Sequence, residues 1–459
     1  MAYETTTGHE GADGSGRARR RRTAPRGRTV LVSGASVAGP ALAYWLGRYG
    51  FRSTVIEVAP ALRGGGFAVD FRGAAQRTVL EHMGVLDDIT RHSTGGGSPL
   101  TFIDAQGRPI AALPAEFTGG EDEILRSELS RILYRHSLDP LRTSHTPGSP
   151  PEYLFGDSVS SLTQTTDGVQ VTFERGAPRT FDLVIGADGL HSTVRRLAFG
   201  PEKDYVRHLG YFVAAWDLPQ GAGDLASRPV GYGEPGRLAT VGRTQRRTEE
   251  PGYAGESFCV FASEEELLHD RRDLRPQKRA ITRAYAGAGW RTPELIDTLG
   301  AVDDLYFDSI SRVDVPHWST GRIALLGDAA YGATVGGMGT GAAVIGAYVL
   351  AGELALAEGD YRTAFARYEH TLRPYVTRCQ EGGRGAGEFL APLTQEAMDA
   401  RSTALNTPAA VAAMLQQGHD ISAAITLEDY PSLVGAAATA PATAPATASA
   451  DGGSPIRTG

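Results

Sequence analysis

Gly34, Ser36 and Gly39 lie in the stretch VSGASVAGPALA, between one apolar run and the next. The run over 28–33 is rich in Val and Leu and predicts a strand, whereas 38–49 carries apolar residues at helical spacing. A strand, a glycine turn and a helix in this order leave unpaired backbone N–H groups and the positive end of the helix dipole at the turn. The stretch therefore predicts a binding site for a phosphate or pyrophosphate group.

The turn differs from the dinucleotide fingerprint G-x-G-x-x-G at its second glycine, which is Ser36 here. That glycine normally lets the backbone approach a pyrophosphate closely. Serine adds one small side chain, and its hydroxyl can donate to a phosphate oxygen. Glu57 lies at the end of the next predicted strand, 53–58, where a carboxylate can accept hydrogen bonds from both ribose hydroxyls. We therefore expect a nucleotide without a 2′-phosphate at this turn.

Two later segments also place an acidic residue beside glycine at the end of an apolar strand. The segment DLVIGADGLHSTVRR contains Asp188, and GRIALLGDAAYGATVGGMGTG contains Gly327 and Asp328. An Asp at a strand end suits a polyol chain, because its carboxylate accepts hydrogen bonds from hydroxyl groups. Gly337 and Gly339 allow backbone N–H groups to reach a ring or a phosphate. The two segments predict further contacts to the same nucleotide.

These three motifs, in this order, resemble those of the single-component (group A) flavoprotein monooxygenases. That family includes relatives of para-hydroxybenzoate hydroxylase and of the tetracycline-inactivating and polyketide-tailoring hydroxylases, and the resemblance covers residues 28–390. It implies FAD as cofactor and NADPH or NADH as co-substrate. By resemblance Glu57 holds the adenosine ribose and Asp328 holds the ribityl chain. The Asp188 segment is expected near the pyrophosphates of FAD and of the incoming nicotinamide nucleotide.

Two arginines also match positions of the family. Arg126, in EILRSELSRIL, matches an arginine that lies on a helix by the FAD phosphates, with a surface ion pair as the alternative. Arg63, in LRGGGFAVDFRG, matches a residue near the adenosine. The resemblance assigns no acid–base residue, and Asp70, Arg72 and Tyr331 are candidates as neighbours of the expected substrate pocket.

The resemblance implies an α/β fold, with a Rossmann-like FAD-binding domain of the GR2 type interleaved with a mixed β-sheet substrate domain and followed by C-terminal helices. The FAD-binding domain is expected over 28–75, 105–200 and 310–360. The substrate domain is expected over 76–104 and 201–309, and the C-terminal helices over 361–432.

Segments such as HLGYFVAAWDL and ESFCVFAS are rich in β-branched and aromatic residues and predict strands of the substrate sheet. Tyr211, Phe212, Trp216 and Phe261 either line an aromatic substrate pocket or form ordinary sheet core.

Composition excludes several other functions. The chain has 459 residues and a net charge of -8, which argues against nucleic acid as the main partner. Its 2 cysteines and 11 histidines show no spacing typical of a disulfide framework or a metal site, and cytoplasmic residence is the simplest expectation. No run of eighteen apolar residues is free of glycine and charge, so no membrane span is predicted.

Both ends differ in composition from the rest. Residues 1–27 are polar and Arg-rich, which is typical of a disordered basic tail, and a basic patch for nucleic acid is the alternative. An export signal is disfavoured because the following apolar run already forms the predicted strand, turn and helix. Residues 433–459 are a low-complexity Ala/Thr/Pro segment and predict a second disordered tail.

One departure from the family concerns the loop over 331–339. Relatives carry a histidine and one or two prolines there, beside the flavin ring, whereas this loop reads YGATVGGMG. The change puts oxygen transfer in question, although a glycine-rich loop can reach the same geometry by another backbone path.

Three functions remain open at this stage. The first is an NAD(P)H-dependent monooxygenase that forms a flavin C4a-hydroperoxide and hydroxylates or epoxidises a large polyketide-like or aromatic molecule. The second is an FAD-bound non-redox [4+2] cyclase of polyketide biosynthesis, which would act by holding a polyene in a reactive shape. The third is a flavin carrier without turnover. The expected partner is a small-molecule substrate that is large, apolar or polycyclic, with neither nucleic acid nor membrane.

Overall fold

The computed structural model describes residues 27–439, except for 65–66, 96–98, 120–121, 140–149, 223, 244–252, 264–272 and 337. The predicted basic tail therefore lies outside the described residues apart from Gly27, and so does the predicted C-terminal tail from 440 onward. Residues 433–439, which we placed in that tail, instead belong to helix α16 (Tyr430–Thr439). Alanine-rich sequence favours a helix wherever a neighbour anchors it, and Tyr430 is buried against the protein.

A six-stranded sheet with the order β17-β18-β11-β1-β2-β7 forms one half of the molecule. All neighbours are parallel except the short β17. The central strands are almost fully buried, as expected of a parallel sheet that is covered on both faces. The strands are β1 (Thr29–Ser33), β2 (Arg52–Glu57), β7 (Glu152–Phe155), β11 (Leu183–Gly186), β17 (Ser319–Thr320) and β18 (Ile323–Leu325).

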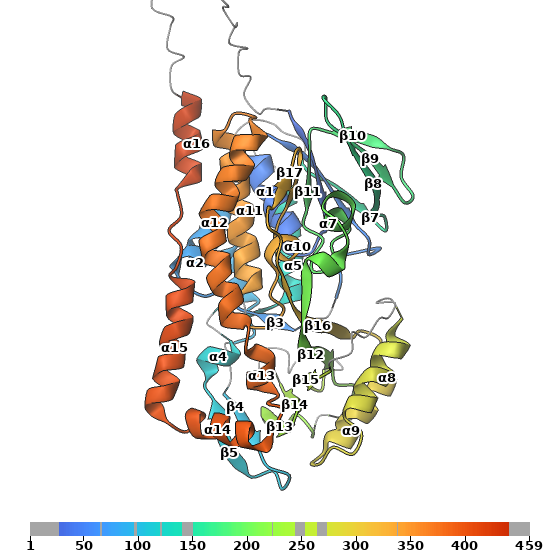
Figure 1. Cartoon of the computed structure of the whole chain (residues 1–459), viewed down its shortest axis with the longest axis vertical. Coiled ribbons are helices and arrows are strands. Elements are labelled where there is room, and N and C mark those ends of the chain that lie inside the picture. Colours follow the sequence, from blue (N-terminus) through green and yellow to red (C-terminus); the bar gives the residue numbers. More distant parts are fainter. Residues whose placement is uncertain are drawn as a thin grey trace, which may run out of the picture.

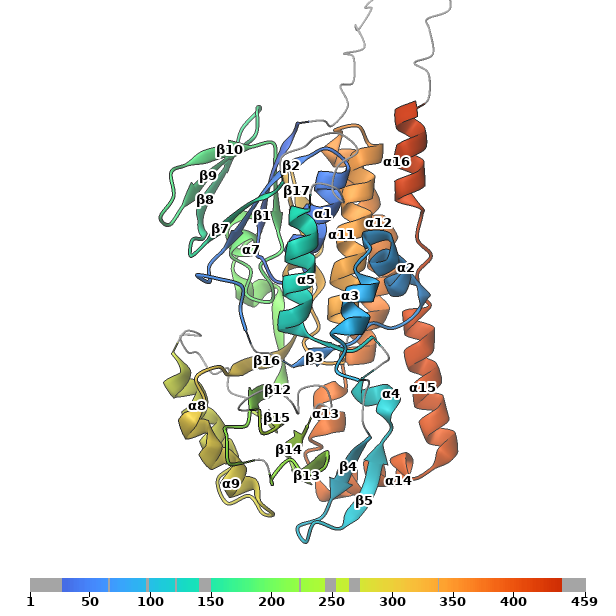
Figure 2. The same ribbon diagram turned by 180° about the vertical axis from the view of Figure 1, so that it is seen from behind.

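Helices cover one face of this sheet, and a small antiparallel sheet together with α7 covers the other (Figures 1 and 2). The helices on the first face are α1 (Ala38–Arg48), α2 (Ala74–Met83), α3 (Leu86–Arg91), α5 (Arg126–Leu138), α11 (Gly339–Leu356) and α12 (Tyr361–Gly383). The elements on the other face are β8 (Val159–Gln164), β9 (Val169–Phe173), β10 (Arg179–Phe181) and α7 (Thr193–Ala198).

α11 is the central helix of this layer. Among the described residues it alone has the length and apolar composition to cross a membrane, and 83% of it is buried inside the protein. Core helices pass the same test, because they are apolar on every side when neighbours surround them.

A seven-stranded sheet, in the order β16-β12-β15-β14-β13-β4-β5, forms the other half. Its strands are β4 (Leu100–Ile103), β5 (Pro109–Leu113), β12 (Val206–Asp217), β13 (Val230–Glu234), β14 (Arg237–Gly242), β15 (Glu256–Ala262) and β16 (Tyr306–Val313). One face packs on α8 (Leu274–Ala284), α9 (Thr292–Asp297) and the short helix η3 (Thr298–Ala301). The other face packs on α4 (Ala115–Thr118), α13 (Ala386–Leu390) and α14 (Gln395–Leu405).

Several segments connect the two halves, among them the following (Figure 1). The ribbon of β3 (Ala68–Val69) and β6 (Ile124–Leu125) lies between the two sheets, and η1 (Glu202–Asp204) leads from α7 into β12. Helix α15 (Pro408–Ser422) runs back from α14 along α12.

The structure differs from the expected division at several places, among them β5 and α2. β5 falls in the range 105–200, which we assigned to the FAD-binding domain, but it pairs with β4 in the seven-stranded sheet. α2 falls in the range 76–104, which we assigned to the substrate domain, but Val79, Leu80 and Met83 of this helix are buried in the core around the six-stranded sheet. Pairing across a hairpin and burial of an apolar helix face decide these positions, and neither is visible in the motifs.

Candidate active site

The carboxyl ends of β1, β11 and β18 meet at one edge of the six-stranded sheet. β2 lies on one side of β1 and β11 on the other, so β1 and β11 flank a topological switch point, where ligands of open α/β sheets bind. The motifs at Gly34, Asp188 and Gly327 directly follow these three strands. The structure therefore brings the three predicted motifs together.

Two glycines of the first motif are required by close backbone approach. Gly34 has φ +107, and a Cβ added there would lie 2.4 Å from the carbonyl oxygen of Ala187. A Cβ added at Gly39 would lie 1.9 Å from the carbonyl oxygen of Gly34. The turn is thus packed closely between the loop after β11 and the first turn of α1.

Glu57 closes β2 beside this turn, as its predicted role requires. One carboxylate oxygen accepts a hydrogen bond from Ala35 N at 2.9 Å, and the other accepts one from Ala59 N at 2.9 Å. The guanidinium of Arg63 lies 3.9 Å from Glu57 and is largely exposed. Both residues therefore lie beside the glycine turn, and their contact with a ribose stays a prediction.

Arg126 links the glycine turn with the third motif. Its guanidinium donates to the hydroxyl of Ser36 at 3.2 Å from the first turn of α5. The same cation lies close enough to Asp328 and Tyr306 to lower the pKa of each, although burial outweighs it in both. This position is expected of a cation that faces a phosphate between the turn and Asp328.

Asp328 begins α10 (Asp328–Tyr331), directly after Gly327, which has φ +65. Within the described part of the chain its carboxylate accepts no hydrogen bond, and burial raises its pKa. The side chain is only partly buried, so a carboxylate without a protein donor is available to accept a hydrogen bond from a ligand. A Cβ added at Gly339 would lie 3.4 Å from this carboxylate, and Gly337 lies outside the described residues. The site fits a hydroxyl-bearing chain of a cofactor.

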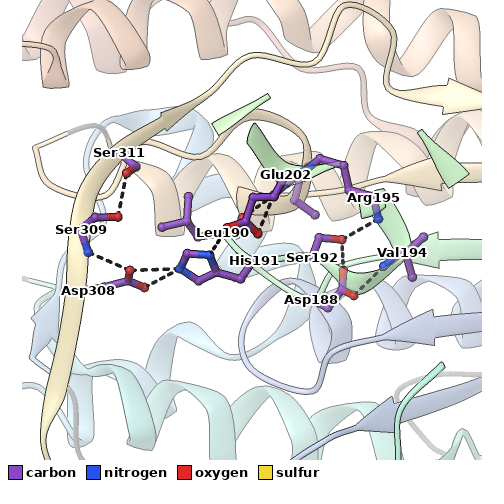
Figure 3. Close-up of polar contacts among 11 residues, drawn as sticks. Asp188, Leu190, His191, Ser192, Val194, Arg195, Glu202, Asp308, Ser309 and Ser311 are labelled. Carbon is purple, nitrogen blue, oxygen red and sulfur yellow. Dashed lines mark hydrogen bonds and ion pairs between the residues drawn. The ribbon is translucent and has the colours of Figure 1, made fainter. Parts of the chain in front are cut away.

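The carboxylate of Asp188 forms its hydrogen bonds with other groups of the protein (Figure 3). It accepts hydrogen bonds from the hydroxyls of Ser33 and Ser192 and from Val194 N at 3.1 Å, and burial raises its pKa. Ser192 in turn caps α7 by accepting from Arg195 N at 3.0 Å. Asp188 therefore shapes the loop after β11 through its side chain.

Asp70 and Arg72 form an ion pair just beyond the β3–β6 ribbon. Sequence reasoning missed their neighbour Glu123, whose carboxylate accepts a hydrogen bond from the Thr94 hydroxyl. Burial, with Asp70 and Glu256 nearby, raises the pKa of Glu123 to about 7. Glu123 directly precedes the strand Ile124–Leu125. This strand could have located Glu123 from the sequence, because it pairs with β3 next to Asp70.

Aromatic rings connect this ribbon with the seven-stranded sheet. The ring of Phe67 contacts Phe258 of β15 at 6.1 Å and Tyr306 of β16 at 5.0 Å between centroids. Tyr306 also lies near Asp328, since both Asp328 and Arg126 shift its pKa. The face of the substrate sheet that carries Phe258 and Tyr306 is therefore the face turned toward the strand ends.

Of the two alternatives for the four aromatic residues, ordinary sheet core holds for three, because alternate residues of a strand face opposite sides of a sheet. Phe212, Trp216 and Phe261 lie in the core against α8 and α9, on the face away from Phe258. Phe212 stacks on Phe261 at 5.7 Å, and the indole of Trp216 donates to the Thr298 hydroxyl at 3.0 Å. Of the four predicted aromatic residues, Tyr211 alone lies on the side of Phe258 and Tyr306.

Tyr331 is not placed for acid–base chemistry. Its side chain is 5% exposed and lies in the helical layer, with its hydroxyl 3.4 Å from that of Tyr368 and its ring 4.7 Å from that of Trp318. These contacts hold the Tyr331 side chain in the core at the end of the single-turn helix α10. Tyr331 is a packing residue.

The loop without proline is held by β16. Thr334 N and the Thr334 hydroxyl each lie 3.2 Å from the carbonyl oxygen of Ser311, and Ser311 N donates to the same hydroxyl at 3.1 Å. Met338 adopts φ +52 at the start of α11. Hydrogen bonds to a strand thus fix the described part of this loop.

Comparison with known proteins agrees with this architecture. A family model described as FAD binding domain matches residues 28–243. An uncharacterised protein of Mycobacterium tuberculosis is 41% identical over 365 residues, covering 77% of this chain and 92% of that protein. A flavin-dependent monooxygenase of Legionella longbeachae is 35% identical over 415 residues, covering 88% of this chain and 98% of the relative. The solved structure of the tetracycline destructase Tet(51) has a TM-score of 0.72 at 31% identity, covering 88% of this chain and all of that one.

An FAD-binding α/β domain joined to a mixed sheet and C-terminal helices defines a flavoprotein oxidoreductase. The chain belongs to the flavin-dependent monooxygenase family, with FAD as its cofactor. This confirms the predicted family, fold class and cofactor, and it replaces the hypothesis of a carrier without turnover. In the described part of the chain no group of three or more His, Cys, Asp or Glu residues could hold a metal ion.

Proposed function

We propose that this monooxygenase transfers one oxygen atom from O₂ to a large apolar molecule of polycyclic, aromatic or polyketide-like structure, with NADPH or NADH as the reductant. The observation that carries the proposal is the aromatic contact of Phe67 with Phe258 and Tyr306, directly beside Asp328. Flat aromatic side chains favour a flat apolar substrate. The likeness to a tetracycline destructase over most of the chain supports a polycyclic substrate.

We further propose how the chain holds FAD. Glu57 accepts hydrogen bonds from the adenosine ribose in place of those from Ala35 N and Ala59 N. Ser36, Arg126 and the N–H groups at the start of α1 bind the pyrophosphate. Asp328 accepts from the ribityl hydroxyls, which supply donors to its partly buried carboxylate. Bound FAD supplies the redox chemistry, accepting hydride from the nicotinamide and reacting with O₂.

The loop over 331–339 is then a wall of the reaction site. Its hydrogen bonds to Ser311 hold it without proline, which supports the monooxygenase over the cyclase. A fixed wall excludes water from the reacting centre.

The test uses the purified yellow protein. NADPH and NADH are added separately without oxygen, and bleaching of the flavin absorbance is followed; oxygen and tetracycline, as a first polycyclic probe, are then admitted and the products are weighed. Reduction by one nucleotide and a product heavier by one oxygen atom are expected. A flavin that neither nucleotide bleaches contradicts the proposal. A product of unchanged mass, formed without nucleotide, identifies the cyclase instead.

A further inference from the structure

His191 lies between two carboxylates that come from distant parts of the chain (Figure 3). Its Nδ1 is 2.8 Å from a carboxylate oxygen of Glu202, and its Nε2 is 3.1 Å and 3.3 Å from the two oxygens of Asp308. The His191 side chain is 19% exposed, so water competes only partly for these contacts. We call these three residues the His191 bridge.

The bridge spans the junction of the two halves of the molecule. His191 follows β11 of the six-stranded sheet, in the loop that Asp188 shapes. Asp308 lies on β16 of the seven-stranded sheet, where Ser309 N donates to its carboxylate at 2.8 Å. Glu202 lies on η1, the segment that leads from one half to the other.

The hydrogen-bond pattern requires a particular state of the ring. A neutral imidazole has one N–H donor and one acceptor nitrogen, whereas the protonated ring donates from both nitrogens. Carboxylates accept only, so a neutral His191 would set a lone pair against one of its two partners. The protonated ring satisfies both, through charge-assisted hydrogen bonds.

β16 also carries residues of the cofactor site. Tyr306, Asp308 and Ile310 alternate on one face of this strand, and Tyr306 contacts Phe67. Asp308 lies near enough to Asp328 to raise its pKa. The position of β16 relative to the loop after β11 therefore sets the shape of the site around Asp328.

We propose that His191 is a positioning residue of the flavin site: its protonated ring fastens β16 to the loop after β11 and thereby holds the site in the form that retains FAD. Deprotonation of the ring removes one of its two donors and its charge, so FAD is held less firmly as pH rises. The proposal concerns retention of the cofactor, and it stands or falls independently of the substrate and of oxygen transfer.

Some of the other charged groups around the His191 bridge favour the protonated ring, and others oppose it. Arg195 of α7 lies 3.6 Å from Glu202, so it competes with His191 for that carboxylate, while it also donates to Ala329 O at 3.0 Å next to Asp328. On the side of β16, Asp328 strengthens the negative charge that faces the ring, and Arg126 opposes it. Among the described residues, the carboxylates of Glu202 and Asp308 lie within hydrogen-bond distance of the ring.

The experiment measures FAD release from the holoenzyme. Protein is diluted at a series of pH values from about 6 to about 9, a range that brackets ordinary imidazole titration, and the rise of free-flavin fluorescence gives the release rate. His191→Gln keeps a donor toward Asp308 and removes the charge. His136→Gln is the matched control, because His136 of α5 pairs with Asp88 at 2.6 Å and is buried away from the three strand ends.

For the wild type we expect release to accelerate about tenfold across the series, the effect of losing one charge-assisted hydrogen bond. H191Q should release FAD fast at every pH with a flat profile, whereas H136Q should keep the wild-type profile. Glu202→Gln removes one of the two negative charges beside the ring. This change should shift the wild-type transition to lower pH. An H191Q variant that keeps the wild-type pH dependence, or an H136Q variant that loses it, overturns the proposal.

Discussion

At the end of β1 the backbone of Gly34 comes so close to Ala187 that no side chain fits between them, whereas large side chains along β12 pack on either face of the sheet. The first region is shaped by backbone approach, which tolerates few residue types. The second is shaped by packing, in which Tyr211 and Phe212 have opposite surroundings although they are neighbours in the chain. The comparison teaches that one added atom should disturb the region that holds the cofactor. In the substrate sheet, the effect of a substitution should depend on which face of the sheet the residue occupies.

The largest effect should come from Gly34→Ala. The new Cβ would meet Ala187 O at 2.4 Å in a backbone with φ +107, so steric overlap adds to backbone strain. We expect a loss of at least about 3 kcal/mol of unfolding free energy and of bound FAD, measured by thermal unfolding and flavin fluorescence. Gly189→Ala is the control, since Gly189 has φ +79 but nothing within 4 Å of the added Cβ. Equal losses in the two variants would show that strain alone acts.

On the substrate side, Phe212→Ala and Phe258→Ala should separate the two faces of the seven-stranded sheet. Phe212 is 2% exposed and stacks on Phe261 and Phe307, so its removal should cost about 3 to 5 kcal/mol of unfolding free energy. Phe258 is only half-buried and contacts Phe67, so F258A should cost less stability but raise KM for the substrate. Denaturant unfolding and steady-state kinetics measure the two effects. A raised KM in F212A with unchanged KM in F258A would reverse the assignment of the faces.

Asp328→Asn should change stability and cofactor binding in opposite directions. Burial raises the pKa of Asp328, so its contribution to the apoprotein is present below the ordinary Asp pKa and is lost as pH rises. Asparagine carries no charge, so the variant does not lose this stability as pH rises. The D328N apoprotein should therefore be at least as stable as the wild type at neutral pH. FAD affinity should fall about tenfold, because a neutral amide accepts less strongly from ribityl hydroxyls. Thermal unfolding of apoprotein and FAD titration test this; unchanged affinity would remove Asp328 from the proposed contacts.

How much of the structure can be predicted from the sequence depends on the same contrast between backbone approach and side-chain packing. The three motifs could be located because a strand, a glycine and an acid leave a local signature, and the family, the fold class and FAD followed from them. The hairpin of β4 and β5 was misplaced, and so was Tyr331, because pairing partners and the direction of a single helical turn are set by distant residues. The alternation of YFDSISRV in β16 was the missed signal for Tyr306 and Asp308.

The smallest expected effect compares two tyrosine hydroxyls on opposite faces of the seven-stranded sheet. The hydroxyl of Tyr211 is buried without a hydrogen-bond partner among the described residues, and burial raises its pKa. The hydroxyl of Tyr285, on the opposite side, lies 2.6 Å from Leu238 O and 2.9 Å from Val260 O. Tyr211→Phe should therefore leave the apoprotein as stable as wild type or stabilise it by up to about 1 kcal/mol, and Tyr285→Phe should cost about 1 kcal/mol. Denaturant unfolding measures both, and a destabilised Y211F would mean that the Tyr211 hydroxyl has a partner, such as a bound water.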